Sequence, residues 1–265
     1  MKIKNLLLVI ALALAFTVPG TTQNTLSTIL ENGEIRIGMT GNQPPYNMKT
    51  KNGRLMGYEV DLAAILAESM GVKLKIVEMP FPELMQALES SKVDAVMSGM
   101  TITPRRSLRA LFAGPYTISG KSILTKSKVL SEISEASEAN VRSYKITCLK
   151  GSTSEKFVRS HMPNSEIIPV ENYDIGIDMV LHDQADALVA DLAICIVTLL
   201  KHQDEGLVML DEPLSLEPIG IALPTDDLQF FNLIDNYMTG LEFTGALDML
   251  HQIWFEDGQW ILNMK

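Results

Sequence analysis

Residues 93–116, VDAVMSGMTITPRRSLRALFAGPY, run from a short apolar segment into a helix start. Residues 93–97 are predicted to be a buried strand, and the segment after them is rich in small and hydroxyl side chains. Thr103 followed by Pro104 is typical of a helix N-terminus, with the threonine as cap and the proline in the first turn. Arg106 would then lie beside unpaired backbone N–H groups. This combination predicts a carboxylate site; the alternative is a solvated helix arginine.

The segments around this stretch alternate between strand and helix patterns. The expected strands are residues 34–39, 73–77 and 93–97, and the expected helices are residues 26–30, 59–70 and 81–90. Such an alternation predicts a mostly parallel sheet with right-handed crossovers. Ligands bind beyond the carboxyl ends of the strands in sheets of this kind. We therefore expect the loops of residues 40–46 and 98–103 to converge.

The same alternation begins again after residue 119. The expected strands are residues 122–125, 145–149, 166–170 and 187–190, and the expected helices begin after residue 155 and span residues 175–181 and 192–201. A strand at residues 217–224 and helices at residues 228–238 and 245–254 end the chain. The sequence therefore predicts a second α/β unit that follows the first.

Two features of this second unit bear on chemistry. Ser152 and Glu155 fit a capping box after Gly151, and a cap without a ligand is the simpler interpretation. Asp191 ends an apolar strand and enters an apolar helix, where a carboxylate is costly unless it is paired. It is either a helix cap or a partner for a cation, and both interpretations stay open.

The N-terminus has the pattern of an export signal. Two lysines in the first four residues precede an apolar run at residues 6–18, which is too short to span a bilayer. We expect residues 1–22 to be a signal peptide and the mature protein to be soluble and periplasmic. An uncleaved N-terminal anchor is the alternative.

Composition excludes several classes of protein. The chain has 265 residues, of which 46% are hydrophobic and 20% charged, so it has the composition of a globular protein. Its formal net charge of −10 argues against a nucleic-acid partner. Export would permit a disulfide between Cys148 and Cys195, but two separately buried thiols are the alternative. The sequence shows no metal-binding cluster, no nucleophile–base pair and no phosphate loop, so we expect no metal, no cofactor and no catalytic residue.

Six stretches together match a known family. They are Pro44-Pro45-Tyr46, residues 57–63, residues 94–106, Gly151-Ser152-Thr153, residues 186–191 and residues 218–224. In these stretches the chain resembles the periplasmic amino-acid-binding proteins of ABC importers, the family 3 extracellular solute-binding proteins. The resemblance implies the two-lobe type II periplasmic-binding-protein fold, with each lobe a mostly parallel sheet flanked by helices, and two hinge strands between the lobes. Lobe 1 would comprise residues 23–118 and 219–265, and lobe 2 residues 119–218.

The resemblance also implies a carboxylate clamp between the lobes. Arg106 would bind the α-carboxylate of an amino acid through a bidentate pair. Thr101 and the backbone of Gly99 would help from the same lobe, and Thr153 from the opposite lobe.

The rest of the ligand would contact other positions. The resemblance implies that Asp191 takes the α-ammonium and that Phe81 stacks on the ligand. Gln43 stands where relatives often place a stacking aromatic residue, so a cationic or aromatic ligand is not implied. Ser152, also expected at the site, replaces the usual threonine.

The implied function is capture of an amino acid and its delivery to the permease subunits of a membrane importer, by a monomer that is not an enzyme. The chain also resembles, more distantly, the periplasmic cyclohexadienyl dehydratase, which acts on prephenate or arogenate. That reaction needs a general acid, and the resemblance implies a glutamate shortly after Asp191. Ala193, Ile194 and Cys195 stand there instead. A ligand-sensing module would use the same pocket and is the other alternative.

Overall fold

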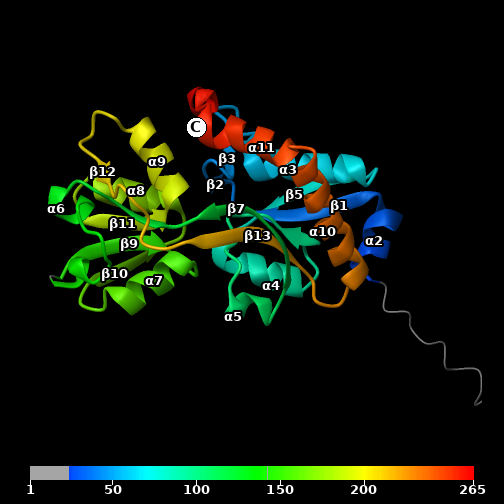
Figure 1. Cartoon of the computed structure of the whole chain (residues 1–265), viewed down its shortest axis with the longest axis horizontal. Helices are drawn as coiled ribbons and strands as arrows, with labels where there is room; N and C mark the ends of the chain where they lie inside the picture. The colour runs from blue at the N-terminus through cyan, green and yellow to red at the C-terminus, as the bar shows by residue number, and fades with distance from the viewer. Residues whose placement is uncertain (1–23, 142) are drawn as a thin grey trace, which may run out of the picture.

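The computed structural model describes residues 24–141 and 143–265, so the expected signal peptide lies outside the described residues. Within them the chain forms two five-stranded sheets and a small three-stranded one. The two large sheets lie at opposite ends of the molecule, with helices on their faces (Figure 1). The expected fold class is confirmed as α/β with two mixed sheets flanked by helices.

The first sheet has the strand order β5-β1-β6-β13-β7. These strands are β5 (Lys73–Glu78), β1 (Glu34–Met39), β6 (Ala95–Val96), β13 (Glu217–Leu223) and β7 (Leu111–Ser119). The first three are parallel, whereas β13 is antiparallel to both of its neighbours. The sheet is therefore mixed because one strand comes from the end of the chain.

Strand β7 is absent from the sequence prediction. Gly114, at φ 106°, and Pro115 interrupt its apolar pattern, and such residues normally mark a turn. Proline is tolerated here because β7 lies at the edge of the sheet. Strand β6 is shorter than the predicted strand of residues 93–97.

Helices and a small sheet surround the first large sheet. The small sheet is β2 (Asn42–Gln43), β3 (Asn47–Lys49) and β4 (Leu55–Met56). The helices are α2 (Thr25–Asn32), α3 (Tyr58–Ser69), η1 (Phe81–Glu83), α4 (Leu84–Glu89), α5 (Pro104–Ser107), α10 (Leu228–Phe243), α11 (Ala246–His251), η3 (Gln252–Glu256) and η4 (Gln259–Asn263). The C-terminal helices return to the first sheet and pack beside α3 (Figure 1).

The second sheet repeats this plan, with the order β10-β9-β11-β8-β12. Its strands are β10 (Glu166–Val170), β9 (Lys145–Leu149), β11 (Ala187–Asp191), β8 (Lys121–Thr125) and β12 (Val208–Met209). Its helices are α6 (Lys128–Ser131), η2 (Glu138–Val141), α7 (Thr153–His161), α8 (Tyr173–Leu181) and α9 (Leu192–Lys201). Again three parallel strands are followed by an antiparallel one, here β8.

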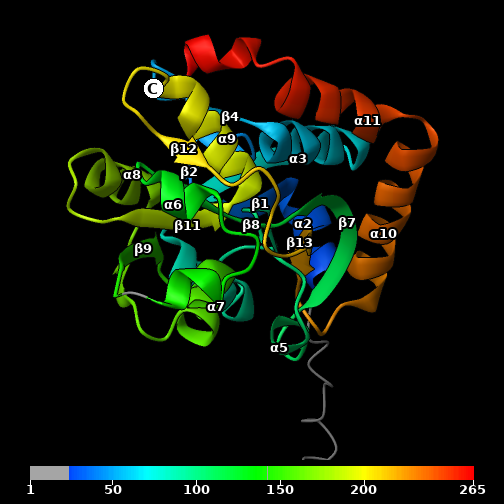
Figure 2. The same cartoon turned by 60° about the vertical axis from the view of Figure 1, so that its left-hand side comes forward.

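The chain crosses between the sheets twice, from β7 into β8 and from β12 into β13 (Figures 1 and 2). The two crossings touch at Gly120. A Cβ atom on this glycine would lie 2.0 Å from the carbonyl oxygen of Ser215, so only glycine fits there. Glu217 and Ser119 are paired in the β13–β7 ladder. The crossings therefore run side by side as a narrow double connection.

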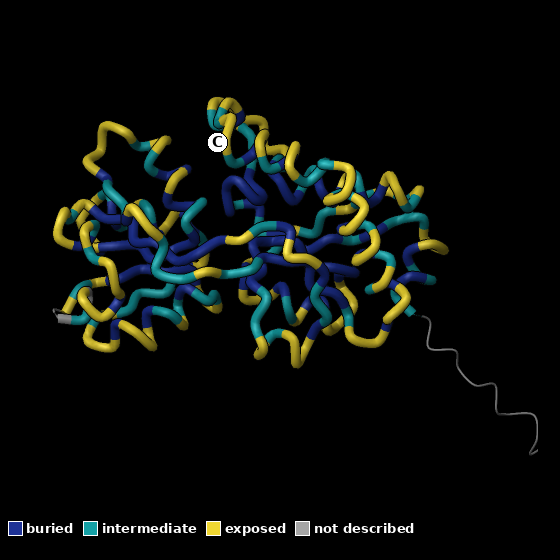
Figure 3. Tube along the Cα trace, viewed as in Figure 1, coloured by how far each residue is buried: buried dark blue, intermediate teal, exposed yellow. Residues whose placement is uncertain are grey.

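Buried residues follow the strands of both large sheets, whereas exposed residues lie on the outer helix faces and loops (Figure 3). Cys148 and Cys195 are both buried and both free. The alternative of two separate thiols is therefore the one that the structure shows. Among the described residues, no helix is both long and apolar enough to cross a membrane.

Candidate functional site

The two loops expected to converge do so at the carboxyl ends of β1 and β6. The Thr40 N–H donates to Ser98 Oγ at 3.1 Å. Asn47 bonds to both loops, since its Oδ1 accepts from the Gly41 N–H at 2.7 Å and its Nδ2 lies 3.4 Å from Ser98 Oγ. The parallel topology thus brings residues that are more than fifty positions apart into one polar cluster.

Arg106 is held by the local structure that the sequence predicts. Thr103 caps α5, with its hydroxyl accepting from the Arg106 N–H at 3.2 Å, and Pro104 lies in the first turn. The guanidinium donates to the Thr101 carbonyl at 2.9 Å. Its carbon lies 5.6 Å from the centroid of the Phe81 ring. Burial lowers the pKa of Arg106 from its ordinary value, although nearby carboxylates oppose that shift. The arginine is therefore held in place by contacts within the protein.

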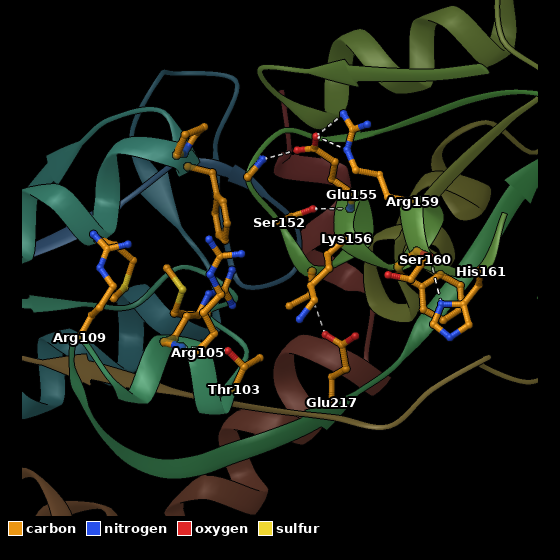
Figure 4. A pocket seen from close by; sticks show the side chains of 18 residues that line it. Thr103, Arg105, Arg109, Ser152, Glu155, Lys156, Arg159, Ser160, His161 and Glu217 are labelled. Atoms are coloured by element: carbon orange, nitrogen blue, oxygen red, sulfur yellow. Dashed lines mark hydrogen bonds and ion pairs between the residues drawn. The ribbon is translucent and has the colours of Figure 1, made fainter. Parts of the chain in front are cut away.

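A cleft of about 630 Å³ lies between α5 and η1 on one side and α7 on the other. Figure 4 shows Arg105 and Arg109 on the first side, and Ser152 and Lys156 on the second. Of the predicted ligand-binding residues, Phe81, Arg106, Ser152 and Thr153 line this cleft. Residues from both halves of the fold therefore face one another across it.

Asp191 is paired within the protein. Its side chain accepts a hydrogen bond from the Lys121 ammonium and forms an ion pair with it; the two side chains are 6% and 1% exposed. Asp191 occupies the N-cap position of α9 but makes no capping bond. Of the two interpretations left open by the sequence, the structure shows the partner of a cation, and that cation is a lysine of this chain.

Glu217 joins the same group. Its Oε2 atom lies 3.0 Å from Lys121 Nζ and accepts from the hydroxyls of Thr101 at 2.9 Å and Thr153 at 2.8 Å. The two hydroxyl oxygens are 3.3 Å apart. Burial alone would raise the pKa of Glu217, but the Lys121 ammonium and the threonine hydroxyls hold it below its ordinary value. Glu217 is therefore an ionised carboxylate at neutral pH.

Three further predicted ligand-binding residues also have partners within the protein. The Gly99 N–H donates to Glu59 Oε1 at 2.7 Å, so this amide is not free. Gln43 is 1% exposed and bonds to Ser98 and Thr40, away from the residues that line the cleft. Ser152 lines the cleft, but its hydroxyl caps α7 by accepting from the Glu155 N–H at 3.2 Å.

Glu59 is a buried acid that supports the site from behind. It is fully buried and accepts hydrogen bonds from Gly99 N–H, from Asn47 Nδ2 at 2.6 Å and from the Tyr116 hydroxyl. Burial raises its pKa to about 7, and the hydrogen bonds from Tyr116, Gly99 and Asn47 oppose this rise. The network fixes the loop that contains Gly99 and Thr101.

Sequence reasoning missed Lys121, Glu217 and Glu59 as parts of the site. Lys121 lies directly opposite Asp191 in the antiparallel β8–β11 ladder. An acid and a lysine in paired positions are a recognisable signal, but it can be used only when the register is known. Glu217 begins a strand that comes from a distant part of the chain, and its charge alone gives no sign of this location.

Residues 35–257 match the family model of the bacterial extracellular solute-binding proteins, family 3. The chain belongs to this family. A cyclohexadienyl dehydratase from Pseudomonas aeruginosa is 28% identical over 234 residues, which is 88% of this chain and 87% of that protein. The L-cystine-binding protein TcyJ from Escherichia coli K12 is 24% identical over 233 residues, covering 88% of this chain and 86% of TcyJ.

Solved structures of the family have the same architecture. A mutant of ArgBP from T. maritima superimposes with a TM-score of 0.83 at 27% sequence identity, covering 88% of this chain and all of that one. The expected type II periplasmic-binding-protein fold is therefore confirmed.

Proposed function

We propose that this protein binds an amino acid in the cleft between its two lobes, outside the cytoplasm, and delivers it to a membrane importer. One observation carries the proposal: Arg106, oriented by Thr101 and stacked on Phe81, faces Thr153 of the other half across the cleft. A guanidinium with hydroxyl groups beside it is a suitable receptor for a carboxylate. Family membership and the cystine-binding relative support an amino acid as the ligand.

The proposed contacts divide between the lobes. Arg106, Thr101 and Thr153 would bind the α-carboxylate, and Phe81 would pack on the ligand. Asp191 would receive the α-ammonium. Because these groups come from both lobes, only a closed cleft makes all the contacts, and ligand binding would stabilise that state. We propose the lobe boundaries given in the sequence analysis, so the chain passes from one lobe to the other near residues 119 and 218.

Binding and the role of Arg106 can be tested together. Mature protein, unfolded and refolded to remove any carried ligand, is screened by thermal shift against each proteinogenic L-amino acid, and the responding ligands are titrated by calorimetry. Arg106→Ala should weaken binding by about 2–5 kcal/mol, because it removes a charged partner from a desolvated contact.

Arg54→Ala is the control, since Arg54 is an exposed arginine that is not among the residues lining the cleft. It should leave affinity almost unchanged. Equal losses in both variants would indicate a general effect of positive charge, and full retention of binding in Arg106→Ala would remove this residue from the site. Absence of any response to the amino acids would overturn the proposed function.

A dehydratase is the second candidate, favoured by the similarity to the Pseudomonas enzyme. Elimination of water requires a general acid near the leaving hydroxyl. The α9 positions where the resemblance expects a glutamate hold Ala193, Ile194 and Cys195. Glu217 lines the cleft, but its lowered pKa makes it a poor acid at neutral pH. Turnover of prephenate or arogenate by the purified protein would nevertheless establish the enzyme and replace the binding-only proposal.

A further inference from the structure

The two crossings place one charged side chain each where the lobes meet. Lys121 begins β8, directly after the first crossing, and Glu217 begins β13, at the end of the second. The two side chains are 1% and 13% exposed, and Nζ lies 3.0 Å from Oε2. An ammonium and a carboxylate that belong to the protein itself therefore lie together, largely removed from water.

These two groups contact the atoms assigned above to the ligand. The Lys121 ammonium donates to Asp191, the acid proposed for the α-ammonium. The Glu217 carboxylate accepts from both threonine hydroxyls proposed for the α-carboxylate, at 2.9 and 2.8 Å. For each charged group of a zwitterionic amino acid, the protein thus has a side chain of the same sign in the same contacts. The Lys121 ammonium corresponds to the α-ammonium, and the Glu217 carboxylate to the α-carboxylate.

We propose that Lys121 and Glu217 are an internal stand-in for the ligand, and that an amino acid binds by displacing the Glu217 carboxylate. This proposal rests on the proposed function, because it takes the carboxylate and ammonium contacts from there. Glu217 is the group that moves, since it is the more exposed of the two and lies at the start of a strand. Lys121 stays with Asp191 until a ligand ammonium competes for the same acid.

The stand-in has two consequences. Thr101 and Thr153 come from the two halves of the fold, so Glu217 ties the lobes together when no ligand is bound. Every ligand must also replace these hydrogen bonds. Its apparent affinity is therefore the intrinsic affinity multiplied by the fraction of protein in which Glu217 has released the threonines. Ligands that lack a well-placed carboxylate gain nothing from that exchange, so the pair sharpens selectivity.

Glu217→Ala is the direct test, because it frees both threonines and leaves the Lys121–Asp191 pair intact. Small-angle scattering of the ligand-free variant should show an expanded molecule relative to wild type. Calorimetry with the L-amino acids that respond in the thermal-shift screen should show binding tightened about tenfold, which corresponds to about 1.4 kcal/mol. Glu217→Leu, which fills similar space but cannot accept a hydrogen bond from the threonines, serves if the alanine variant does not fold.

Glu171→Ala is the matched control. Glu171 is an exposed glutamate paired with Lys150 at 2.7 Å, outside the cleft. Its removal should change neither the scattering nor the affinity.

The outcomes separate this inference from the proposed function. Ligand-free scattering that is identical for Glu217→Ala and wild type overturns the stand-in, whatever the affinities are. Weaker amino-acid binding by the variant also overturns it, because Glu217 would then be a ligand contact. If no amino acid binds to either protein, the proposed function fails, while the scattering still decides whether Glu217 ties the lobes together.

The lysine is tested by its effect on selectivity. In Lys121→Met, the ligand ammonium would be the cation nearest to Asp191. The preference for the responding L-amino acid over its 2-hydroxy acid counterpart should then rise about tenfold relative to wild type, equivalent to about 1.4 kcal/mol. Circular dichroism checks that the variant is folded. An unchanged preference would contradict the assignment of Lys121 as a stand-in for the ligand ammonium.

Discussion

Two buried carboxylates support this site, and the protein accommodates them in opposite ways. Glu59, on α3 of the first half, is fully buried and accepts hydrogen bonds from neutral donors of Gly99, Asn47 and Tyr116. Asp191, at the end of β11 in the second half, is also buried but pairs with the Lys121 ammonium. The Glu59 carboxyl is compensated by neutral hydrogen-bond donors, and the Asp191 carboxylate by a buried cation.

This difference between the partners of the two acids points to two roles, structural support for Glu59 and ligand exchange for Asp191. Donors that include a backbone N–H and a buried tyrosine cannot be replaced without moving the loops, so Glu59 has a structural role. Exchange of one ammonium for another leaves the charge beside Asp191 unchanged, so the Asp191 pair is suited to ligand exchange. The Glu59 network should therefore respond to pH and the Asp191 pair to loss of its cation.

Lys121→Met should have the largest effect on stability. It leaves the Asp191 carboxylate buried without a cation, which costs about 3–5 kcal/mol in comparable buried pairs. Denaturant unfolding of ligand-free protein measures the loss. Lys150→Met, which breaks the exposed ion pair with Glu171, is the control and should cause no measurable loss. Equal stabilities of the two variants would mean that Asp191 does not depend on Lys121.

Glu59→Gln should change the pH dependence of stability. The folded-state pKa of Glu59 is raised to about 7 from its ordinary value of 4.5, so the folded protein keeps a proton that the unfolded chain releases between these values. Stability from this group is fully present below pH 4.5 and is lost as the pH rises to 7. The free energy of unfolding of wild type minus that of Glu59→Gln should therefore fall by about 3 kcal/mol across this interval.

Glu68→Gln is the control for that measurement, because Glu68 lies on the same helix but is exposed. Its difference from wild type should stay nearly constant over the same pH range. A flat difference for Glu59→Gln as well would show that Glu59 titrates at its ordinary pKa in the folded protein.

The contrast between the two acids also explains what could be predicted from the sequence. Strands β1, β9 and β10 and helix α9 have the predicted bounds, because their periodicity and end signals are local. The Thr103 cap and the position of Arg106 are likewise local, and both are confirmed.

The contacts of the two acids depend instead on pairing between distant segments. Lys121 meets Asp191 only through the β8–β11 register, and Glu217 reaches the site only because β13 returns to the first sheet. Local patterns say that Asp191 needs a partner but not which residue supplies it. Strand β7 was missed for a related reason, since its turn-forming residues are tolerated only at the sheet edge where tertiary structure places it.

Tyr116→Phe should have a smaller effect that depends on pH. It removes one hydrogen-bond donor from Glu59 and preserves the ring, which lies 5.6 Å from that of Tyr58. A hydrogen bond to an ionised acceptor contributes about 1.5–3 kcal/mol and a neutral one about 0.5–1.5 kcal/mol. The loss of stability should therefore be near the upper range above pH 7, where Glu59 is ionised, and near the lower range at pH 5.

Tyr58→Phe is the matched control, because the Tyr58 hydroxyl donates to the neutral Tyr116 carbonyl at 3.2 Å. Its loss should not vary between these pH values. If both variants lose the same stability at both values, the Tyr116 hydroxyl does not stabilise the charge of Glu59, and Gly99 and Asn47 alone compensate it.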